Sequence, residues 1–495
     1  MKQNLNLRLD VLPPGQFRIF GADSAYARQT PFDSARRIPV GDLVVECDEA
    51  LRSTVIEDAN GEIVAVVLGN AFMVDLRCRL ASEHFAGFHA AADQQEAFEA
   101  VYAGLFGAFV IVLKCRDGCC LYLDAGGSLS AVYSQELGVA GATAGAILSA
   151  EGYRERRDMA LYERLGVVEE GWFPSGLTAH HGVSRLLCNH RLRLADMKAE
   201  RSWPLVIPQR NADADAVLDR LESAVRSNLR AIFDHYRAAL ALTGGGDSRA
   251  LLSLLKDQRD HLTTYIVNAS SLSAVDIHVS QVIAKRAGLD HRVLVPFDAD
   301  PERERVWHFH GGHALGGRNG HVQTALHRLE DCDAIIDGLG AEFARCFFWK
   351  DSDTESMDVT AEMIARRFGM PPSSEVVEAT RRWLADVPKG DAFLTLDLAY
   401  MELRNSAWAY AQSYTDTRFL HFSPIVSRRS VLAMFELPIA VKREGFPKIV
   451  VRRNWPELSL IPYSRYGDAR DWLHLARKAS DPRRVLKKIR KLLAQ

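Results

Sequence analysis

A short glycine-rich segment strongly constrains how the second half of this chain can fold. Residues 243–249 read Thr-Gly-Gly-Gly-Asp-Ser-Arg and lie between an apolar run at 238–242 and a helical pattern at 250–255. Three successive glycines let the backbone turn sharply and present its N–H groups to an anion, and the following helix adds its N-terminal dipole. This order of strand, turn and helix is typical of a phosphate-binding parallel sheet.

The residues around this segment repeat the alternation of helix and strand. Apolar side chains at spacings of three and four predict a helix over 218–236, and a second pattern predicts a helix over 275–286 that ends at Gly288. Short apolar runs predict strands at 262–267, 292–295 and 334–336. Alternation at this spacing predicts a parallel sheet with right-handed crossovers.

The first 200 residues have a different pattern, mostly strands with glycine-containing turns. Asp117-Gly118 lies between apolar runs at 109–113 and 120–123 and predicts a β-hairpin, and a helix is expected over about 94–106. The nearby Cys115, Cys119 and Cys120 leave zinc binding open as an alternative. No CxxC pair or clustered histidine accompanies them, so the hairpin is the preferred interpretation.

A change of composition marks a domain boundary near residue 205. The stretch 203–215 contains two prolines and a polar run, which is typical of a linker. A chain of 495 residues is long enough for two packed cores. We therefore expect one domain over 1–205 and a second over 206–495.

Charge and hydropathy exclude several classes of protein. Lys plus Arg number 61 and Asp plus Glu 63, so the net charge of -2 gives no whole-surface attraction for nucleic acid, and no nucleic-acid partner is expected. There is no apolar run of 18 residues and no signal-like start, which predicts a cytoplasmic protein without a transmembrane segment. The eight cysteines are scattered and are expected to be reduced thiols.

The polar residues of the glycine segment suggest its chemistry. Thr243 and Ser248 supply hydroxyl donors, and Asp247 is a hard oxygen ligand suited to Mg²⁺ on a polyphosphate. The segment is not a Walker A loop, because no Gly-Lys-Ser/Thr follows it. The alternative is an ordinary strand-to-helix turn in which Asp247 only caps the helix.

Residues 243–248 resemble the Ser-Gly-Gly-x-Asp-Ser loop of the PP-loop ATP pyrophosphatases. Within that superfamily the chain is similar to glutamine-hydrolysing asparagine synthetases and to their relatives, the β-lactam synthetases and lasso-peptide macrolactam cyclases. The resemblance implies a fold of the α/β plus α+β type. It consists of an N-terminal nucleophile-hydrolase-like β-sandwich, an inactive glutaminase-like domain, followed by a PP-loop parallel-sheet ATP domain that uses ATP and Mg²⁺.

The resemblance also assigns roles to individual residues. Glu342, at the end of a second glycine loop, matches the family's second Mg²⁺ ligand and joins Asp247 as a metal residue; Arg345 would pair with it or with phosphate. Lys448 matches a phosphate-binding lysine, and Arg465 replaces the lysine that stabilises the transition state. The implied ATP-binding residues are Ala241, Thr243, Gly244, Gly245, Gly246, Asp247, Ser248, Val267, Gly338 and Lys448. Glu342 as a cap or surface carboxylate, and Arg465 in a surface salt bridge, remain alternatives.

Two departures from the family narrow the expected activity. The glutaminase reaction needs a cysteine directly after the initiator Met, whereas this sequence has Lys2 there and its first cysteine is Cys47. We therefore expect no glutaminase activity. The tyrosine of the β-lactam synthetase Tyr-Glu pair is replaced by Leu339, so that mechanism is not expected either.

Two further segments carry open interpretations. His308, His310, His313 and His321 lie in a glycine-rich stretch that is expected to be a flexible, substrate-contacting loop, with a metal site or a catalytic base as alternatives. The basic tail 477–495 has helical spacing. It is expected to be a solvated helix packed by one face, or a dock for an acidic partner or membrane surface.

Together these features predict an ATP-dependent, AMP-forming amide synthetase with Lys448, Arg465 and Glu342 as catalytic residues. Its substrate would be a small molecule or peptide that bears a carboxylate and an amine. The first subtype is a lasso-type macrolactam cyclase or related natural-product ligase, with a peptide-processing protein as a possible partner. Ammonia-dependent amidation of a small acid or sugar acid, and a non-catalytic degenerate homologue, are the alternatives.

Overall fold

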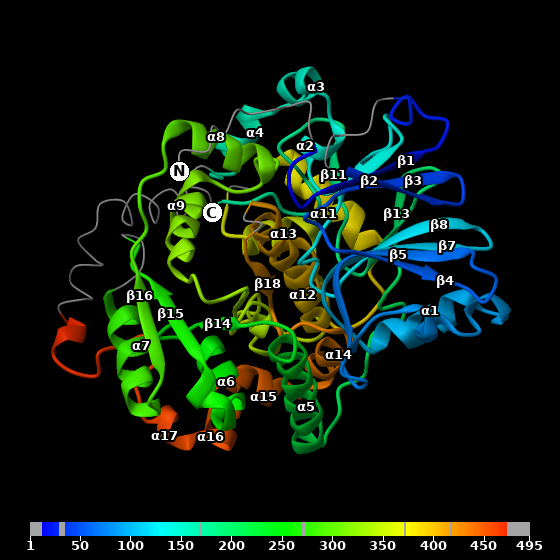
Figure 1. The fold of residues 1–495 in the computed structure, drawn as a ribbon. Coiled ribbons are helices and arrows are strands. Elements are labelled where there is room, and N and C mark those ends of the chain that lie inside the picture. Colours follow the sequence, from blue (N-terminus) through cyan, green and yellow to red (C-terminus); the bar gives the residue numbers. More distant parts are fainter. Residues whose placement is uncertain are drawn as a thin grey trace.

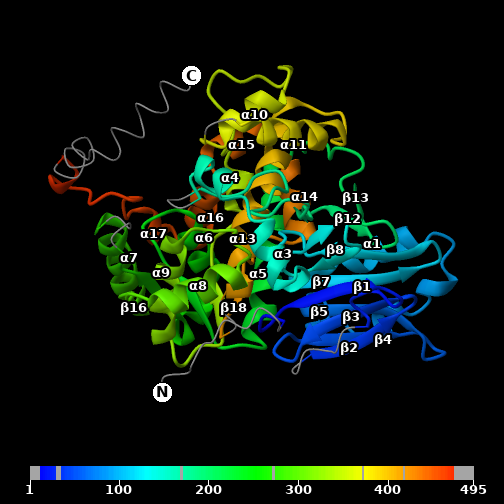
Figure 2. The same ribbon diagram turned by 90° about the horizontal axis from the view of Figure 1, so that it is seen from above.

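The computed structural model describes residues 12–28, 35–167, 171–269, 274–370, 373–415 and 418–472. Two antiparallel sheets form the first part of the chain, and a five-stranded parallel sheet with helices follows (Figure 1). Figure 2 shows the same two parts side by side from above. Lys2 and the predicted helix of the basic tail lie outside the described residues.

The first two sheets are built from short antiparallel strands. One has the order β11-β9-β10-β1-β3-β2 and the other β13-β12-β8-β7-β5-β4, with β6 paired to β5. Their bounds are β1 (Phe17–Gly21), β2 (Ala35–Val40), β3 (Leu43–Asp48), β4 (Ser53–Glu57), β5 (Ile63–Met73), β6 (Cys78–Arg79), β7 (Leu105–Cys115), β8 (Gly118–Leu123), β9 (Val132–Ser134), β10 (Val139–Gly141), β11 (Ser184–Arg185), β12 (His190–Arg193) and β13 (Lys198–Arg201).

A shared hydrophobic core joins the two antiparallel sheets. Ile19 and Val45 of the first sheet are buried in one cluster with Val66 and Val110 of the second. Alternation of side chains along each strand turns the next residues to the opposite face, where Phe98 of the helix α1 covers the second sheet. The sheets therefore pack face to face, with a helix on the outer side of one of them.

The predicted hairpin is confirmed, with a small shift. Cys115 pairs with Gly118 across β7 and β8, so the turn is formed by Arg116 and Asp117, one residue earlier than predicted. The preceding helix α1 ends at Ala103, because Gly104 is followed at once by β7. The described residues hold no group of three or more metal-binding side chains, so the zinc alternative at these cysteines finds no support.

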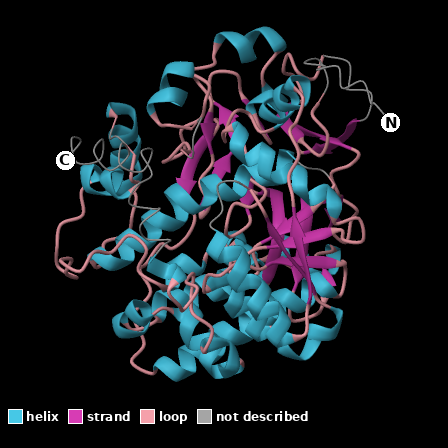
Figure 3. Ribbon diagram, turned by 90° about the vertical axis from the view of Figure 1, so that its left-hand side faces the viewer, coloured by secondary structure: helices cyan, strands magenta, loops and turns pink. Residues whose placement is uncertain are grey.

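The helices surround the strands and make up most of the second part (Figure 3). Their bounds are α1 (Gln94–Ala103), α2 (Ala144–Ile147), α3 (Ala150–Glu155), α4 (Met159–Arg164), α5 (Ala214–Phe233), α6 (Asp247–Leu254), α7 (Ala274–Ala287), α8 (Pro301–His310), α9 (Gly317–Thr324), α10 (Ala361–Arg367), α11 (Ser374–Ala385), α12 (Ala392–Ala399), α13 (Ser406–Thr415), α14 (Arg428–Glu436), α15 (Ile439–Glu444), α16 (Phe446–Asn454) and α17 (Pro456–Ser459). Shorter helical turns are η1 (Ser82–Phe85), η2 (Phe88–Ala90), η3 (Lys256–His261), η4 (Ala325–Arg328), η5 (Ala341–Ala344) and the π-helix η6 (Tyr400–Asn405).

The third sheet confirms the predicted parallel architecture. Its strands are β14 (Ala238–Ala241), β15 (Thr263–Val267), β16 (Asp290–Leu294), β17 (Ala334–Ile336) and β18 (Leu420–Phe422). All neighbours run parallel in the order β16-β15-β14-β17-β18. The chain first builds outward from β14 to β16 and then returns to place β17 on the other side of β14.

The parallel sheet is covered on both faces. Leu240 and Ile336 point into a large core with the predicted helix α5, whereas Tyr265 and Ile335 pack on η4 at the opposite face. The larger core also contains Phe72 of β5, so the two parts of the chain share buried surface. The stretch 202–213 between β13 and α5 contains neither helix nor strand.

One predicted loop is wrong. His308 and His310 belong to α8, and His321 belongs to α9, so most of the histidine-rich stretch is helical rather than a flexible loop. Asp300 caps α8 by accepting a hydrogen bond from the Arg303 N–H, and Pro301 opens the first turn, which starts a helix despite the later glycines. Within the described ranges, no helix is both long and apolar enough to cross a membrane.

Candidate functional site

The strand order defines where a ligand would bind. β14 has β15 on one side and β17 on the other, so the chain leaves the carboxyl ends of β14 and β17 in opposite directions. In open parallel sheets this reversal leaves a crevice at which ligands bind. The two predicted glycine loops follow these two strands, and a Cβ added at Gly338 would lie 2.9 Å from the Cβ of Asp247. The fold therefore brings the two loops into contact.

Internal hydrogen bonds fix the first glycine loop. The Thr243 N–H donates to Ser248 Oγ over 3.0 Å, and the Gly245 N–H donates to Thr243 Oγ1 over 3.3 Å. Gly246 is the N-cap of α6 and no side chain caps that helix, so Asp247 does not have the purely capping role of the alternative interpretation. The hydroxyl groups of Thr243 and Ser248 therefore bond within the loop, whereas the Asp247 carboxylate bonds to a residue outside it.

Close packing explains two of the glycines. A Cβ at Gly244 would lie 2.7 Å from Asp276 Oδ1 of α7, and one at Gly246 would lie 3.2 Å from the Cβ of Pro447 in α16. Either addition would force the loop away from its neighbours. The approach of two helices to the loop therefore favours glycine at positions 244 and 246.

One arginine bridges the two predicted metal ligands. Arg345 Nη2 donates to Asp247 Oδ2 and to Glu342 Oε1, each over 2.9 Å. The other Glu342 oxygen accepts the Gly340 N–H over 3.2 Å. Glu342 therefore belongs to the site itself and is not a detached surface carboxylate.

Burial raises the pKa of two groups at this site. Burial raises the pKa of Asp247 to about 7, with Glu342 adding to the increase and Arg345 opposing it. Burial, together with the nearby negative charge of Glu342, raises the pKa of Tyr400 well above its ordinary value. A shift of this kind is typical of a site prepared to receive a positive charge.

The donor set fits Mg²⁺ only together with a phosphate ligand. Asp247 and Glu342 offer hard oxygen atoms that converge on a single nitrogen atom of Arg345. Nowhere in the described residues do three or more metal-binding side chains cluster, so the protein alone offers too few ligands. Mg²⁺ in phosphate-transfer sites commonly takes one or two carboxylates and completes its shell with water and substrate phosphates.

Lys448 lies beside the same loop. It occupies the first turn of α16, is exposed, and forms no ion pair with the described residues. Its neighbour Pro447 contacts the loop at Gly246, and a Cβ at Gly445 would lie 3.7 Å from that of Arg345. An unpaired cation at a helix N-terminus, next to a glycine loop, is well suited to an anion.

Sequence analysis missed Arg249, the residue that holds this corner together. Its side chain is completely buried and donates to four backbone carbonyls, those of Gly244, Leu458, Ile461 and Pro462. It also lies 3.9 Å from the centre of the Tyr463 ring. An arginine inside the apolar pattern of a short helix was the available signal.

This anchor places the segment that carries Arg465 against the glycine loop. The Ser464 N–H donates to the Gly244 carbonyl over 2.9 Å, and Ser464 Oγ donates to Asp276 Oδ1 over 3.1 Å. Arg465 itself is exposed and has no ion pair with the described part of the chain. The alternative of a surface salt bridge therefore finds no support.

The two remaining residues that were predicted to bind ATP lie at strand ends. Ala241 is the last residue of β14 and Val267 the last of β15. Both point to the face of the sheet that packs on η4. They flank the carboxyl edge from which the glycine loop departs.

The histidines lie elsewhere, between the two parts of the chain. His308 and His313 stack with ring centres 5.1 Å apart, and Tyr153 Oη is 2.8 Å from His313 Nδ1. Burial lowers the pKa of His180 and of His313 to about 3, and that of His310 to about 4. The rings of His310 and His313 are therefore neutral at ordinary pH and are poor proton acceptors, which argues against either of them as the catalytic base.

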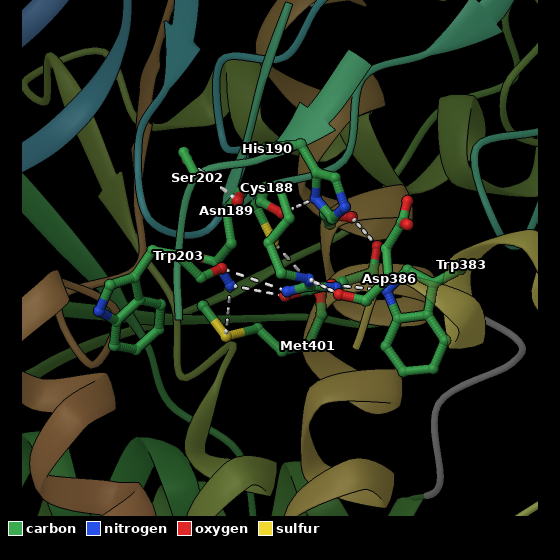
Figure 4. Close-up of polar contacts among 11 residues, drawn as sticks. Cys188, Asn189, His190, Ser202, Trp203, Trp383, Asp386 and Met401 are labelled. Atoms are coloured by element: carbon green, nitrogen blue, oxygen red, sulfur yellow. Dashed lines mark hydrogen bonds and ion pairs between the residues drawn. The ribbon is translucent and has the colours of Figure 1, made fainter. Parts of the chain in front are cut away.

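A second carboxylate-arginine centre joins the two parts (Figure 4). Glu402 in η6 accepts four hydrogen bonds, two from Arg201 of β13 at 2.8 Å, one from Asn189 at 3.0 Å and one from Trp383 at 2.6 Å. Burial opposes ionisation, but Arg201 and the hydrogen bonds lower the pKa of Glu402. Every donor here has a partner, so we interpret this centre as one that stabilises the contact between the two parts of the chain.

Comparison with known proteins gives no family for this chain. No protein-family model matches it, and no curated protein matches it in sequence at a significant level.

Proposed function

We propose that this chain is an ATP-dependent, AMP-forming amide synthetase. The observation that carries the proposal is the convergence of Asp247 and Glu342 beside a glycine loop at the reversal point of a parallel sheet. Two exposed cations without ion pairs among the described residues, Lys448 and Arg465, belong to segments that contact the same loop. Together they provide anion-binding groups and metal ligands beside one loop at the carboxyl edge of the sheet.

Each group has a role in this proposal. Backbone N–H groups of the glycine loop and Lys448 bind the phosphates, and Asp247 with Glu342 would hold Mg²⁺. The metal, when bound, would neutralise charge on the polyphosphate. Arg465 keeps its positive charge at all relevant pH values, so it stabilises developing negative charge but does not act as a base.

The reaction proceeds in two displacements. A substrate carboxylate attacks the α-phosphorus of ATP, the bond to the bridging oxygen breaks, and pyrophosphate leaves. An amine then attacks the activated carbonyl carbon, the bond to AMP breaks, and the amine proton passes to solvent. The resemblance to macrolactam cyclases favours an amine within the same peptide or natural product as the first substrate to examine.

Formation of AMP tests the proposal. The purified chain, incubated with ATP, Mg²⁺ and pools of amino acids and peptides, is expected to release AMP and pyrophosphate. Asp247→Ala is expected to lower the rate at least about 100-fold, because it removes a metal ligand beside the reacting phosphate. Asp333→Ala is the matched control, since Asp333 precedes β17 at the opposite edge of the sheet and pairs with exposed Arg237. Release of ADP and phosphate would contradict the proposal.

A second candidate is a nucleotide-binding protein without catalysis. The guanidinium of Arg345 lies between the two carboxylates, where an active enzyme would hold a metal ion. This candidate predicts ATP binding that is independent of Mg²⁺ and no AMP with any carboxylate. Magnesium-dependent AMP formation that Asp247→Ala abolishes would exclude it.

A further inference from the structure

An unusual arginine borders the candidate site. Arg404, in the π-helix η6, has its guanidinium carbon 4.5 Å from the ring centre of Phe347, 5.3 Å from that of Tyr400 and 5.7 Å from that of Trp172. Three rings from three separate segments thus surround one cation. π-Helical turns are rare and are found frequently at functional sites.

The polar side-chain atoms of Arg404 have no partner among the residues that the structure describes. It forms no hydrogen bond and no ion pair with any described residue, and its side chain is partly exposed. Aromatic rings interact with the face of a guanidinium, whereas its five N–H donors lie in the plane. The aromatic contacts therefore hold the cation in position and leave its donors available for a carboxylate.

The neighbouring arginines behave differently. Arg345 donates to both Asp247 and Glu342, and Arg201 donates twice to Glu402. Each of them neutralises a carboxylate of the protein itself. Arg404 is a cation beside the candidate site without such a carboxylate, which indicates an external anion.

The aromatic residues connect Arg404 to the candidate site and give it an apolar surface. The guanidinium carbon of Arg345 lies 5.8 Å from the ring centre of Phe347, which is 41% exposed and has its ring centre 4.8 Å from that of Tyr400. Trp172 belongs to the first part of the chain, between α4 and β11, and is buried. The Phe347 ring thus lies near both Arg345, which binds the two candidate metal ligands, and Arg404, so a carboxylate bound by Arg404 is separate from one that reacts beside those ligands.

We propose that Arg404, with Phe347, Tyr400 and Trp172, is the substrate-recognition site for a carboxylate carried on a flat, apolar part of the substrate. The proposal rests on the proposed function for the identity of the bound molecule as substrate. It narrows that substrate to an acid with a second carboxylate beside an aromatic or similarly planar group. Phe347, the exposed ring, binds the planar group, the buried rings of Tyr400 and Trp172 hold the guanidinium in position, and Arg404 binds the second carboxylate through its N–H donors.

Binding of benzoate, measured without ATP by NMR titration, tests this site, and benzamide is the uncharged probe of the same shape. Benzoate is expected to bind the full chain, and Arg404→Gln is expected to weaken its binding about tenfold or more, with little change for benzamide. Phe347→Ala is expected to weaken both probes. Arg443→Gln is the matched control, because Arg443 also lies near an aromatic ring, that of Phe393, but pairs with Asp351.

Arg404→Lys is a second variant in case Arg404→Gln fails to fold. It keeps the positive charge but loses the planar guanidinium, so its affinity for benzoate is expected to be intermediate. Equal benzoate affinity in the wild type, Arg404→Gln and Arg404→Lys would overturn the inference, as would the absence of benzoate binding to the wild type. If AMP is never formed but benzoate binding requires Arg404, the anion site stands and the proposed function fails. If AMP is formed and benzoate binding ignores Arg404, only this inference fails.

Discussion

The two arginine-carboxylate centres of this protein differ in how completely their charges are satisfied. At the junction of the two parts, a single carboxylate, Glu402, accepts four hydrogen bonds, two of them from Arg201. At the glycine loop, two carboxylates, Asp247 and Glu342, share one nitrogen atom of Arg345. The first centre has an excess of donors and the second an excess of negative charge.

The pKa shifts follow this difference. The pKa of Glu402 is lowered although the side chain is completely buried, whereas the pKa of Asp247 is raised to about 7. The Glu402 carboxylate is stabilised by its full set of hydrogen-bond donors. The Asp247 and Glu342 carboxylates share one cation, so a second cation would stabilise them. The comparison separates a group that holds the fold from a group that is available for chemistry.

The largest expected effect is at the saturated centre. Glu402→Gln leaves the buried Arg201 charge without a counter-ion and is expected to lower the free energy of unfolding by about 3–5 kcal/mol. Urea unfolding followed by circular dichroism measures the loss. Asp196→Ala, which breaks an exposed pair with Arg193, is expected to change stability much less. Similar losses in the two variants would remove the distinction between the centres.

Buried histidines at the same junction are expected to make it sensitive to acid. The pKa of His180 is about 3 in the folded protein, far below that of an exposed histidine. The unfolded chain therefore binds the proton first as the pH falls, and stability is expected to drop by about 1.4 kcal/mol per pH unit from about pH 6 downward. Unfolding free energies at several pH values, for the wild type and His180→Gln, measure the slope.

His181→Gln is the matched control for this slope, because His181 is the next residue and its side chain is 71% exposed. The slope is expected to flatten in His180→Gln and to persist in His181→Gln. Since His308, His313 and Arg157 also face this cluster, part of the slope remains in either variant. An unchanged slope in His180→Gln would show that its ring does not remain neutral in the folded state.

The smallest expected effect on stability is at the candidate site. Asp247→Asn removes one of two competing negative charges and leaves the Glu342–Arg345 pair intact. A carboxyl with a raised pKa opposes folding as the pH rises through and above its unfolded value, so the variant is expected to be more stable than the wild type at pH 8. Thermal or urea unfolding at pH 8 and pH 5 measures the gain, which is expected to shrink at the lower pH. A large loss instead would make Asp247 a structural residue.

Local patterns in the sequence predicted much of the fold. The spacing of Leu218, Leu221 and Val225 predicted α5, and the apolar runs at 262–267 and 334–336 predicted β15 and β17. These predictions succeeded because the 3.6-residue and two-residue periods reflect burial within one element. The glycines at 311–320 led to a loop prediction that is wrong for α8 and α9. Asp300 caps α8, which contains no glycine, whereas Gly311, Gly312 and Gly316 do lie between the two helices.

Sequence also indicated much of the candidate site, although unevenly. The residue types of the glycine loop pointed to phosphate chemistry, and the fold brings the loop next to Glu342 and Lys448. Arg249 and Arg404 were not predicted as site residues. Their contact partners lie up to 213 and 232 positions away in the chain, so no pattern of neighbouring residues could predict these contacts.

The sequence alone determined the elements of this protein and the chemistry of its glycine loop, because strand, turn and helix preferences act over a few residues. Tertiary structure decided which charges are satisfied. Long-range packing surrounds Glu402 with donors from both parts of the chain, so that it stabilises their contact. It also leaves Asp247 a carboxylate that lacks full compensation, and it holds the cation of Arg404 among aromatic rings. Burial and the number of nearby partners set the free energy of a charge, and both depend on the whole fold.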